Sequence, residues 1–119
     1  MTEFNEYKVS EELERMALEA LEVARDTGRV KKGINEVTKS IERANARIVY
    51  IADDIVPPEI AMHIPYLCKE KKVPFLVVGG KKKLGKTVGI EVPTSSVAIT
   101  NPGDGEKMVR NLAKKLLTE

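Results

Sequence analysis

The sequence predicts an α/β fold in which helices cover both faces of a small sheet. Amphipathic helical patterns alternate along the chain with short runs of almost entirely apolar residues. Such runs are typical of strands buried on both faces, because half-exposed strands alternate apolar and polar residues instead. The length of 119 residues fits one domain around one core. We therefore expect a single domain over residues 1–119, an α/β sandwich with a mixed sheet of about four strands.

The N-terminal half of the chain contains two predicted helices and two predicted strands. Ser10 precedes an acidic turn and Gly28 ends an amphipathic pattern, which predicts a helix between them. A short extended segment over 29–32 follows, and a second helix is expected from about residue 35 to 46. The segment RIVYIADD, residues 47–54, is an apolar run closed by two aspartates, as in a buried strand.

Four main elements follow in the C-terminal half: a helix over 57–72, a buried strand over 74–80, a short strand over 96–100 and an amphipathic helix over 104–117. Proline is tolerated in the first turn of a helix, so Pro57 and Pro58 fit a helix start, whereas Pro65 is expected to break or kink the helix. Residues 81–89 are expected to form a short helix or turn, and residues 90–94 a loop.

The net charge of +2 conceals an uneven distribution of charge. Residues 1–26 hold eight acids against three bases, residues 27–50 hold six bases against two acids, and residues 81–119 hold eight bases against four acids. If folding brings the two basic segments together, a polyanion such as nucleic acid becomes a suitable partner. Two solvated basic surfaces without a partner explain the charge equally well.

Several classes of protein are disfavoured by composition. No window approaches the roughly 18 consecutive apolar residues of a membrane span, and the acidic N-terminus lacks an apolar signal core. The single cysteine, Cys68, excludes an intrachain disulfide and favours a reducing, cytoplasmic location. With one histidine, His63, the common zinc-ligand sets cannot be assembled, so we expect no metal and no cofactor. We expect Cys68 and His63 to be packing residues.

No catalytic set is apparent in the sequence, and we expect a protein that is not an enzyme. Asp53 and Asp54 follow a strand and could act in catalysis, but they are more typical of residues that cap the following turn. No nucleophile with a base and an orienting group can be drawn from these residues.

Residues 80–87, GKKKLGKT, match the phosphate-loop pattern of nucleotide-binding enzymes. That pattern uses backbone N–H groups to hold phosphates, a lysine (here Lys86) on the terminal phosphates and a hydroxyl (here Thr87) on magnesium. Three lysines and a leucine are bulky side chains for a loop that must close around an anion. The strand IVYIADD, whose aspartates would hold the metal, comes before the loop, whereas a nucleotide-binding core usually starts with the loop. Little chain remains after Thr87 to build the rest of such a core. A phosphate-loop enzyme is therefore the alternative function, and a lysine-rich turn is the simpler interpretation.

The segment KKGINEVTKS, residues 31–40, admits a structural and a functional interpretation. The helical period places Ile34, Val37, Ile41 and Ala44 on one side and Asn35, Glu36, Lys39 and Arg43 on the other. In the structural interpretation Asn35 caps the helix, while Glu36 suits the helix dipole and pairs with Lys39.

The functional interpretation is recognition of nucleic acid by the same outward side chains. Lys39 can donate to guanine O6 and N7, Asn35 can donate and accept, and Glu36 can accept from base amino or imino groups. The neighbouring Lys31 and Lys32, together with Arg43, could contact phosphates. For the isolated motif, the helix cap remains the better supported of the two.

A loop with large apolar residues follows the lysine-rich segment. Ile90 and Val92 lie between Gly89 and Pro93. Such residues either pack into the core or contact a ligand, for example a base extruded from an RNA stack. An aromatic stacking platform is poorly supported, because the chain has two Phe, three Tyr and no Trp.

Three stretches together resemble the archaeal kink-turn-binding ribosomal protein family, the large-subunit protein "seven-Ae", whose relatives include eukaryotic small nucleolar and spliceosomal proteins. They are KKGINEVTKSIERANARIVYIADDIVPPEI, LCKEKKVPFLVV and KKKLGKTVGIEVPTSSVAI. The resemblance runs from about residue 10 to 102 without large gaps and assigns residues 80–87 to a lysine turn. It implies a three-layer α-β-α sandwich that binds kink-turns, in which an internal loop and tandem sheared G·A pairs bend an RNA helix.

The resemblance also implies a set of RNA-binding residues: Lys32, Gly33, Asn35, Glu36, Lys39, Arg43, Lys81, Ile90, Glu91 and Val92. The Gly-x-Asn-Glu segment and the lysine that follows it would read the guanines of the sheared pairs. The remaining basic residues would contact the RNA backbone or nearby bases, and the Ile-Glu-Val loop would pack against an extruded nucleotide.

Family membership would imply partners as well. The expected RNAs are ribosomal RNA, box C/D and box H/ACA guide RNAs and ribonuclease P RNA; the expected protein partners are a Nop-type scaffold and a fibrillarin-type methyltransferase. Two features depart from the family pattern, Ile34 in place of a small or hydroxyl residue and the pair Gly79-Gly80 ahead of Lys81. The second departure is expected to loosen the turn that places Lys81. A protein-interaction module using the acidic first helix is a further alternative.

Overall fold

The computed structural model describes residues 7–117, so residues 1–6 and 118–119 of the predicted domain lie outside the described residues. The main elements are α1 (Glu11–Thr27), β1 (Arg29–Lys32), α2 (Ile34–Glu42), β2 (Ile48–Ala52), α3 (His63–Lys71), β3 (Phe75–Val78), α4 (Lys81–Thr87), β4 (Ser96–Asn101) and α5 (Glu106–Leu117). Two short 3-10 helices, η2 (Pro58–Ala61) and η3 (Gly103–Gly105), precede α3 and α5. All four predicted strands are present.

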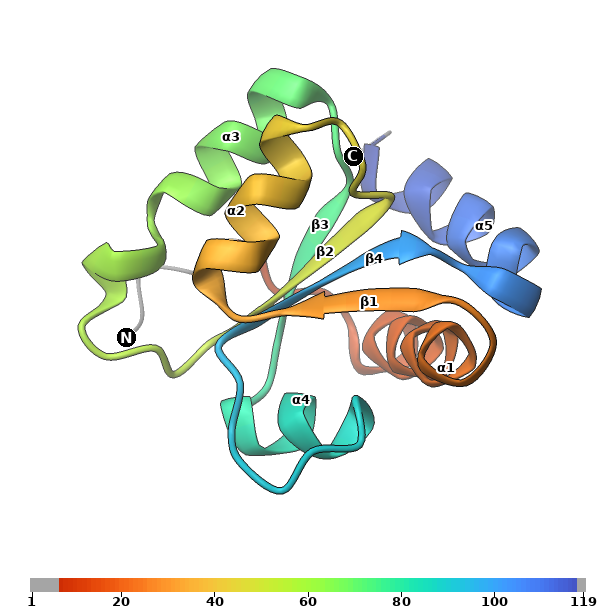
Figure 1. Ribbon diagram of the computed structural model, residues 1–119, viewed down its shortest axis with the longest axis horizontal. Coiled ribbons are helices and arrows are strands. Elements are labelled where there is room, and N and C mark those ends of the chain that lie inside the picture. Colours follow the sequence, from red (N-terminus) through yellow and green to blue (C-terminus); the bar gives the residue numbers. More distant parts are fainter. Residues whose placement is uncertain (1–6, 118–119) are drawn as a thin grey trace.

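The four strands form one mixed sheet in the order β1-β4-β2-β3 (Figure 1). β4 is antiparallel to both of its neighbours, whereas β2 and β3 are parallel. Every residue of β2 is buried, as its continuous apolar run predicts for a central strand. The predicted mixed sheet of about four strands is therefore confirmed.

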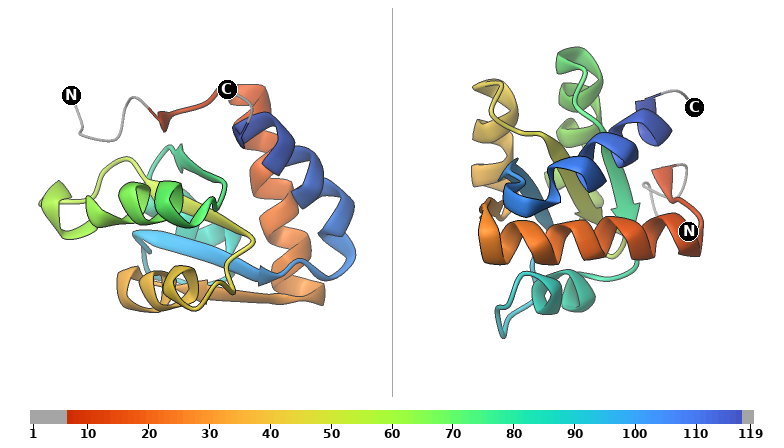
Figure 2. Two further views of the ribbon diagram at one scale, coloured as in Figure 1. Left: turned by 90° about the horizontal axis from the view of Figure 1, so that it is seen from above. Right: turned by 90° about the vertical axis from the view of Figure 1, so that its right-hand side faces the viewer.

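Helices cover both faces of this sheet and produce three layers (Figures 1 and 2). α2 packs beside α3 on one face, while α1 packs against α5 on the other. α4 contacts α1 and β4 and lies at one end of the sheet. The three-layer α-β-α arrangement agrees with the expectation from the resemblance. Within residues 7–117, no helix combines the length and apolarity that a membrane crossing requires.

The largest fully buried side chain is Tyr50, in the middle of β2. Its hydroxyl donates a hydrogen bond to the carbonyl oxygen of Ala17 in α1. Burial raises the pKa of the Tyr50 phenol, so the group stays neutral and requires a hydrogen-bond partner. This contact joins the sheet to α1 at the centre of the core.

α1 begins as its sequence predicts. Ser10 is the N-cap, and its hydroxyl accepts a hydrogen bond from the backbone N–H of Leu13 at 3.2 Å. Three glutamates in the first turn complement the positive end of the helix dipole. The predicted start and end of this helix are both confirmed.

Two other predicted helices are shorter than expected. α2 ends at Glu42, because Ala44 adopts a left-handed conformation with φ of 60° and is exposed rather than on the core side. The helix predicted over residues 57–72 is divided into η2 and α3. Pro65 lies buried in the first turn of α3, where its missing N–H costs no hydrogen bond, so it does not break that helix.

Candidate nucleic-acid interface

Three segments that are distant in the sequence meet where β1 ends and β4 begins. The backbone N–H of Gly33 donates to the carbonyl oxygen of Ser96 at 2.9 Å, which joins the start of α2 to the start of β4. The N–H of Thr94 donates to the carbonyl oxygen of Lys81 at 3.1 Å, which joins the end of the 88–95 loop to α4. Strand pairing adds a third connection, since Lys32 lies opposite Val97. The fold therefore brings the two predicted RNA-contacting regions together.

The start of α2 is organised by Gly33 and not by Asn35. Gly33 is the N-cap, with φ of 90° and ψ of 155°, and no side chain caps the helix. Such a conformation is essentially restricted to glycine. The interpretation of Asn35 as the cap is therefore wrong: the helix already begins at Ile34, which places Asn35 inside its first turn. The side chain of Asn35 is exposed and makes no hydrogen bond within residues 7–117.

The other predicted base-reading side chains of α2 also face solvent. The Lys39 ammonium lies 3.6 Å from a Glu36 carboxylate oxygen, and both side chains are about half exposed, so the predicted ion pair is confirmed. An exposed pair of this kind stabilises a helix by only a few tenths of a kcal/mol, roughly 0.2–0.5. Both groups can therefore exchange this contact for a ligand at little cost.

The single histidine joins α2 to α3 on the outer surface. His63 is exposed, so its assignment as a packing residue is wrong, whereas Cys68 is buried as predicted. The Nε2 atom of His63 lies 2.8 Å from the Thr38 hydroxyl. That hydroxyl already donates its one proton to the carbonyl oxygen of Ile34, so it accepts from Nε2–H of His63. This bond fixes the His63 ring beside the outward face of α2.

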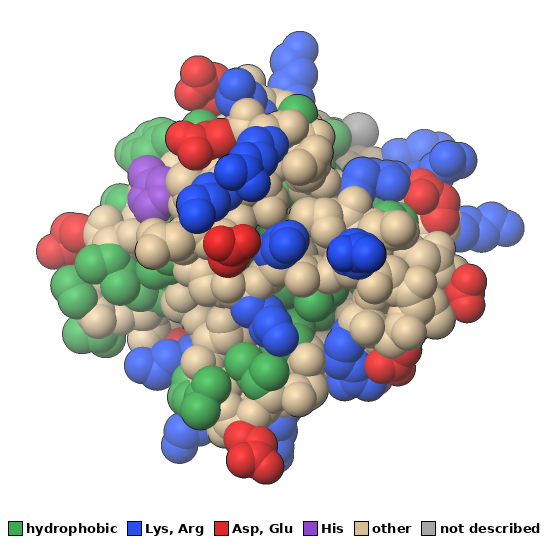
Figure 3. All heavy atoms as spheres, viewed as in Figure 1, with side chains coloured by type: hydrophobic (Ala, Val, Ile, Leu, Met, Phe, Trp, Pro, Cys, Tyr) green, Lys and Arg blue, Asp and Glu red, His purple; other side chains and the backbone are tan. Residues whose placement is uncertain are grey.

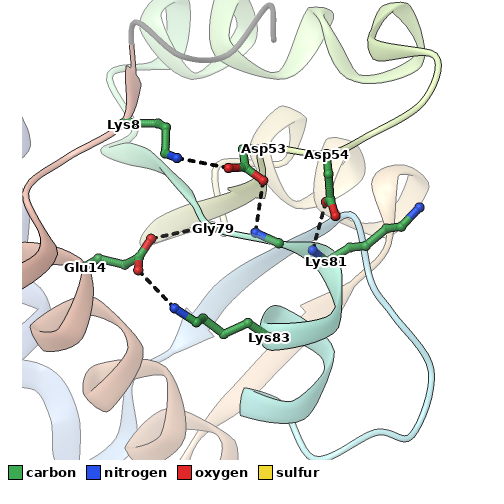
Figure 4. A network of polar contacts seen from close by, with 8 residues as sticks. Lys8, Glu14, Asp53, Asp54, Gly79, Lys81 and Lys83 are labelled. Atoms are coloured by element: carbon green, nitrogen blue, oxygen red, sulfur yellow. Dashed lines mark hydrogen bonds and ion pairs between the residues drawn. The ribbon is translucent and has the colours of Figure 1, made fainter. Parts of the chain in front are cut away.

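The start of α4 is held by three carboxylates from elsewhere in the chain (Figure 4). The bonded pairs are Gly79 N–H with Glu14 Oε1 at 2.8 Å, Gly80 N–H with Asp53 Oδ1 at 3.1 Å and Lys81 N–H with Asp54 Oδ1 at 2.9 Å. The aspartates therefore do not cap the turn that follows them but bind the N-terminus of α4. Neither do the two glycines loosen this turn, because each of their N–H groups has a carboxylate partner.

These carboxylates compensate for a sequence that disfavours the start of a helix. α4 has only seven residues, no side-chain N-cap of its own and three lysines in its first turn, where the helix dipole disfavours cations. Glu14 also pairs with Lys83 at 3.4 Å, and Asp53 with Lys8 at 3.0 Å. Figure 4 shows the Lys81 side chain extending away from this network, so its ammonium remains available on the surface.

The C-terminal end of α4 is held by Arg25 of α1. The Arg25 guanidinium donates to the carbonyl oxygen of Thr87 at 3.0 Å and also pairs with Asp26 at 2.8 Å. The chain then reverses at Gly89, whose φ is 78°, and the N–H of Ile90 donates back to Gly85 at 3.0 Å. α1 therefore holds α4 at both ends.

The loop after α4 exposes some of its apolar residues and packs others. Ile90 is partly buried against the core, Glu91 is exposed, and Val92 has 63% of its surface exposed. Packing into the core therefore describes Ile90, whereas Val92 is exposed enough to contact a ligand. The loop lies directly on α4, since a Cβ added at Gly85 would overlap the carbonyl oxygen of Val92.

The phosphate-loop interpretation does not fit this geometry. Residues 81–87 are helical, so Lys86 and Thr87 lie at the end of a helix and not at its start, where phosphates bind. The N–H groups at the start of α4 already have carboxylate partners, and the Thr87 hydroxyl donates to the carbonyl oxygen of Lys83 at 2.8 Å. Within the described part of the chain, no group of three or more His, Cys, Asp or Glu residues could hold a metal ion.

Figure 3 shows Lys and Arg side chains across the face that carries α2 and β1, with hydrophobic side chains at its lower edge, over the loop that follows α4. Lys32 and Arg43 are both exposed on α2 or its flanks. Arg43 is the C-cap of α2, so it lies about 13 Å along the helix from the residues at its start. The other nine predicted site residues lie at or near the junction of the three segments.

Two residues with a structural role at this site, Glu14 and Arg25, were not identified from sequence, and for Asp53 and Asp54 the sequence indicated a different role. Glu14 is part of an acidic first turn that α1 would contain in any case, and Arg25 lies in its last turn. Nothing in their spacing relates them to residues 79–87. Only the unfavourable lysine-rich start of α4 indicates that compensating carboxylates are needed.

Comparisons with known proteins agree with this geometry. A model of the ribosomal protein L7Ae/L30e/S12e/Gadd45 family matches residues 16–109, which include all three converging segments. Among solved structures, the chain is similar to the Giardia lamblia 15.5kD RNA binding protein, with 31% sequence identity and a TM-score of 0.87. That similarity covers 93% of this chain and 92% of the other.

Proposed function

The chain belongs to the ribosomal protein L7Ae/L30e/S12e/Gadd45 family, and from this membership we propose that it is a non-enzymatic protein that recognises kink-turn RNA. The similar Giardia lamblia structure is that of an RNA-binding protein and supports RNA as the ligand. The observation that carries the finer proposal is the junction itself. An outward-facing Asn35, Glu36 and Lys39 lie beside the partly exposed Lys81 and an apolar loop.

The side chains of α2 supply base recognition in this proposal. Lys39 donates to the O6 and N7 atoms of a guanine, and Glu36 accepts from guanine amino and imino groups. Sheared G·A pairs leave these guanine edges accessible to a helix end. Asn35 needs no protein partner to be displaced before it binds, because its side chain makes no hydrogen bond within residues 7–117.

The remaining residues supply backbone and nucleotide contacts. Lys32, Arg43 and Lys81 neutralise phosphates, while Ile90, Glu91 and Val92 contact an extruded nucleotide. RNA of this kind exchanges between extended and kinked forms, and a protein that binds only the kinked form shifts the equilibrium toward it. The protein acts by stabilising an RNA shape and needs no catalytic group or cofactor.

The particles in which the protein acts belong to the same proposal. We propose ribosomal RNA, box C/D and H/ACA guide RNAs and ribonuclease P RNA as ligands, with a cytoplasmic location. A Nop-type scaffold and a fibrillarin-type methyltransferase would join the guide-RNA particles. Val56 before η2, Ile60 in η2 and Tyr66 in α3 are exposed by 80%, 49% and 65%. Figure 3 shows hydrophobic side chains gathered in this region, as expected for a protein partner.

A gel-shift comparison of a kink-turn RNA with a variant lacking its G·A pairs tests the proposal. The wild-type protein is expected to bind the intact RNA much more tightly. Lys39→Ala and Glu36→Ala should each weaken binding to the intact RNA by about 1–3 kcal/mol and leave the disrupted RNA almost unaffected.

Matched controls are Lys107→Ala and Glu12→Ala, which make the same charge changes at exposed positions outside the site. They should leave the preference for intact RNA unchanged. Equal weakening of both RNAs by Lys39→Ala would contradict base recognition and leave only a charge effect.

A further inference from the structure

A basic groove lies at the end of the sheet opposite to the proposed interface. It has a volume of about 620 Å³ and is bounded by α5 and by the turns over residues 43–47 and 71–74. The parallel strands β2 and β3 both begin directly after these turns. Ser96, at the proposed interface, pairs instead with Ile51 near the far end of β2. The groove is therefore distinct from the site already described.

Five basic residues line this groove: Arg47, Lys71, Lys72, Arg110 and Lys114. Glu106 joins the two arginines, at 2.6 Å from Arg47 and 2.8 Å from Arg110. Hydrogen bonds from Arg47 and then Arg110 lower the pKa of Glu106 to about 2, so the carboxylate stays charged and holds both guanidinium groups in place. Arg110 uses only Nε in this pair, which leaves its two terminal nitrogens without a hydrogen bond among residues 7–117.

Helix dipoles account for only part of this charge. The C-terminal end of a helix carries the equivalent of roughly half a negative charge. α3 ends at the groove with Lys71 in its last turn and Lys72 at its C-cap, which is more positive charge than its dipole offsets. Even without Lys114, the lining residues Arg47, Lys71, Lys72 and Arg110 outnumber the carboxylate of Glu106, so the described part of the groove has an excess of positive charge.

The floor of the groove strengthens the field of these cations. Val73, Pro74 and Val109 form part of the floor and are buried. A cleft with apolar walls and charges of one sign concentrates its field and attracts a polyanion. Apolar atoms make up most of the surface that lines the groove, and Leu117 is the one large exposed hydrophobic residue in its described part. The basic residues around this floor favour a polyanion, and the connection to the proposed interface along α2 favours a nucleic-acid backbone over an acidic protein segment.

The groove also continues the proposed interface along α2. Arg43, one of the residues proposed to contact the RNA backbone, directly precedes Ala44, which lines the groove. Lys39 and Arg43 lie on the exposed face of α2 between the two regions. In Figure 3 basic side chains extend from the face around α2 and β1 toward α5. A stem that leaves the interface along α2 would reach the groove after about 13 Å.

We propose that this groove is a second RNA contact, which binds the phosphate backbone of one stem that flanks the kinked site. The inference rests on the proposed function for the placement of the RNA. Lys71, Lys72 and Arg110 neutralise phosphates of this stem, and the two terminal nitrogens of Arg110, which its pair with Glu106 leaves open, suit a phosphate group. The contact adds affinity but no base specificity.

The test uses three kink-turn RNAs: one with two short stems, one with the first stem lengthened and one with the second stem lengthened. Wild-type protein should bind one lengthened RNA more tightly than the short RNA. Lys71→Glu/Lys72→Glu should remove this gain, with a loss of roughly tenfold on that RNA, and reduce the salt slope by about two. Binding to the short RNA should stay within about twofold of the wild-type value.

Two further variants separate the groove from general charge effects. Arg110→Gln removes one positive charge without adding a carboxylate beside Glu106. It should therefore give a smaller loss, about threefold, on the same lengthened RNA. Lys107→Glu changes the charge of α5 outside the groove and should behave as wild type. A thermal melt of each variant checks that the fold is retained.

The outcomes are distinguishable from failure of the proposed function. If wild-type protein does not prefer the short kink-turn to a G·A-disrupted RNA, the proposed function fails. If it does, and Lys71→Glu/Lys72→Glu lowers binding to no lengthened RNA, or to all three RNAs equally, the groove proposal is overturned. Binding of a polyglutamate peptide that is lost in this variant, with RNA affinities unchanged, would also overturn it and make the groove a protein-docking site.

Discussion

α2 and α4 begin in the same way but are stabilised differently. Each follows a glycine with positive φ, 90° at Gly33 and 98° at Gly80, and neither has a side-chain cap from its own flanking residue. α2 has an acid, Glu36, in its first turn, which suits the helix dipole. α4 has three lysines there and depends on carboxylates 27 to 65 residues away in sequence.

The difference concerns the two halves of the proposed interface. The half that reads bases is built on a helix start that its own sequence favours. The half that carries Lys81 and the apolar loop is positioned by α1 and by the end of β2. Substitutions can therefore show whether each helix start is stabilised by its own sequence or by residues distant in the sequence.

The largest effect is expected for Gly85→Ala in α4. An added Cβ would overlap the carbonyl oxygen of Val92, so the loop must move away from the helix. We expect a loss of about 3 kcal/mol in the free energy of unfolding and weaker RNA binding. Urea denaturation measures the first quantity and a gel shift the second.

Gly79→Ala is the matched control, because its Cβ would make only an ordinary contact, 3.8 Å from the Glu14 carboxylate. It should be nearly neutral. Equal stability of the two variants would show that the loop does not depend on its close approach to α4.

The second effect compares the two helix starts directly. Gly33→Ala and Gly80→Ala place a Cβ in open space, so only the backbone conformation resists the change. Each should cost about 2 kcal/mol in the free energy of unfolding, because both positions have a conformation that favours glycine. Urea denaturation of the pair checks this. A cost at one position only would mean that the other helix start can relax without strain.

The third effect concerns the remote support of α4. Glu14→Ala leaves the Gly79 N–H without its acceptor and Lys83 without its ion pair. We expect a loss of about 1.5 kcal/mol in the free energy of unfolding. Faster amide hydrogen exchange should appear in α4 but not in α2.

Glu12→Ala serves as the control, since it removes an acid from the same first turn of α1 at an exposed position. If both variants increase exchange in α4 to the same extent, the effect arises from α1 as a whole and not from the carboxylate contact.

The smallest effect on stability is expected for Asn35→Ala. Because Asn35 is not the cap, the free energy of unfolding should change by less than about 0.5 kcal/mol. Ser10→Ala removes a cap that is observed and should cost about 1 kcal/mol. Thermal denaturation measures both. A cost at Asn35 as large as that at Ser10 would restore the capping role that the geometry rejects.

The sequence allowed the class of fold and most elements to be predicted. Fully apolar runs identified β2 and β3, and Ser10 with its acidic turn located the start of α1. The boundaries of α2 and α3 were less accurate. The left-handed conformation of Ala44 and the separation of η2 from α3 have no distinct signal in residue type or period.

What the sequence determined by itself is the set of chemical groups and their local order. The helical period alone required Asn35, Glu36 and Lys39 to face outward, because Val37 and Ile41 must be buried. Tertiary structure decided which of these groups act together. The meeting of Gly33 with Ser96, and the capture of α4 by Glu14, Asp53 and Asp54, depend on contacts between segments that no local pattern relates. Such contacts form only when the core positions the strands, since burial drives folding and hydrogen-bond partners follow from the arrangement it produces.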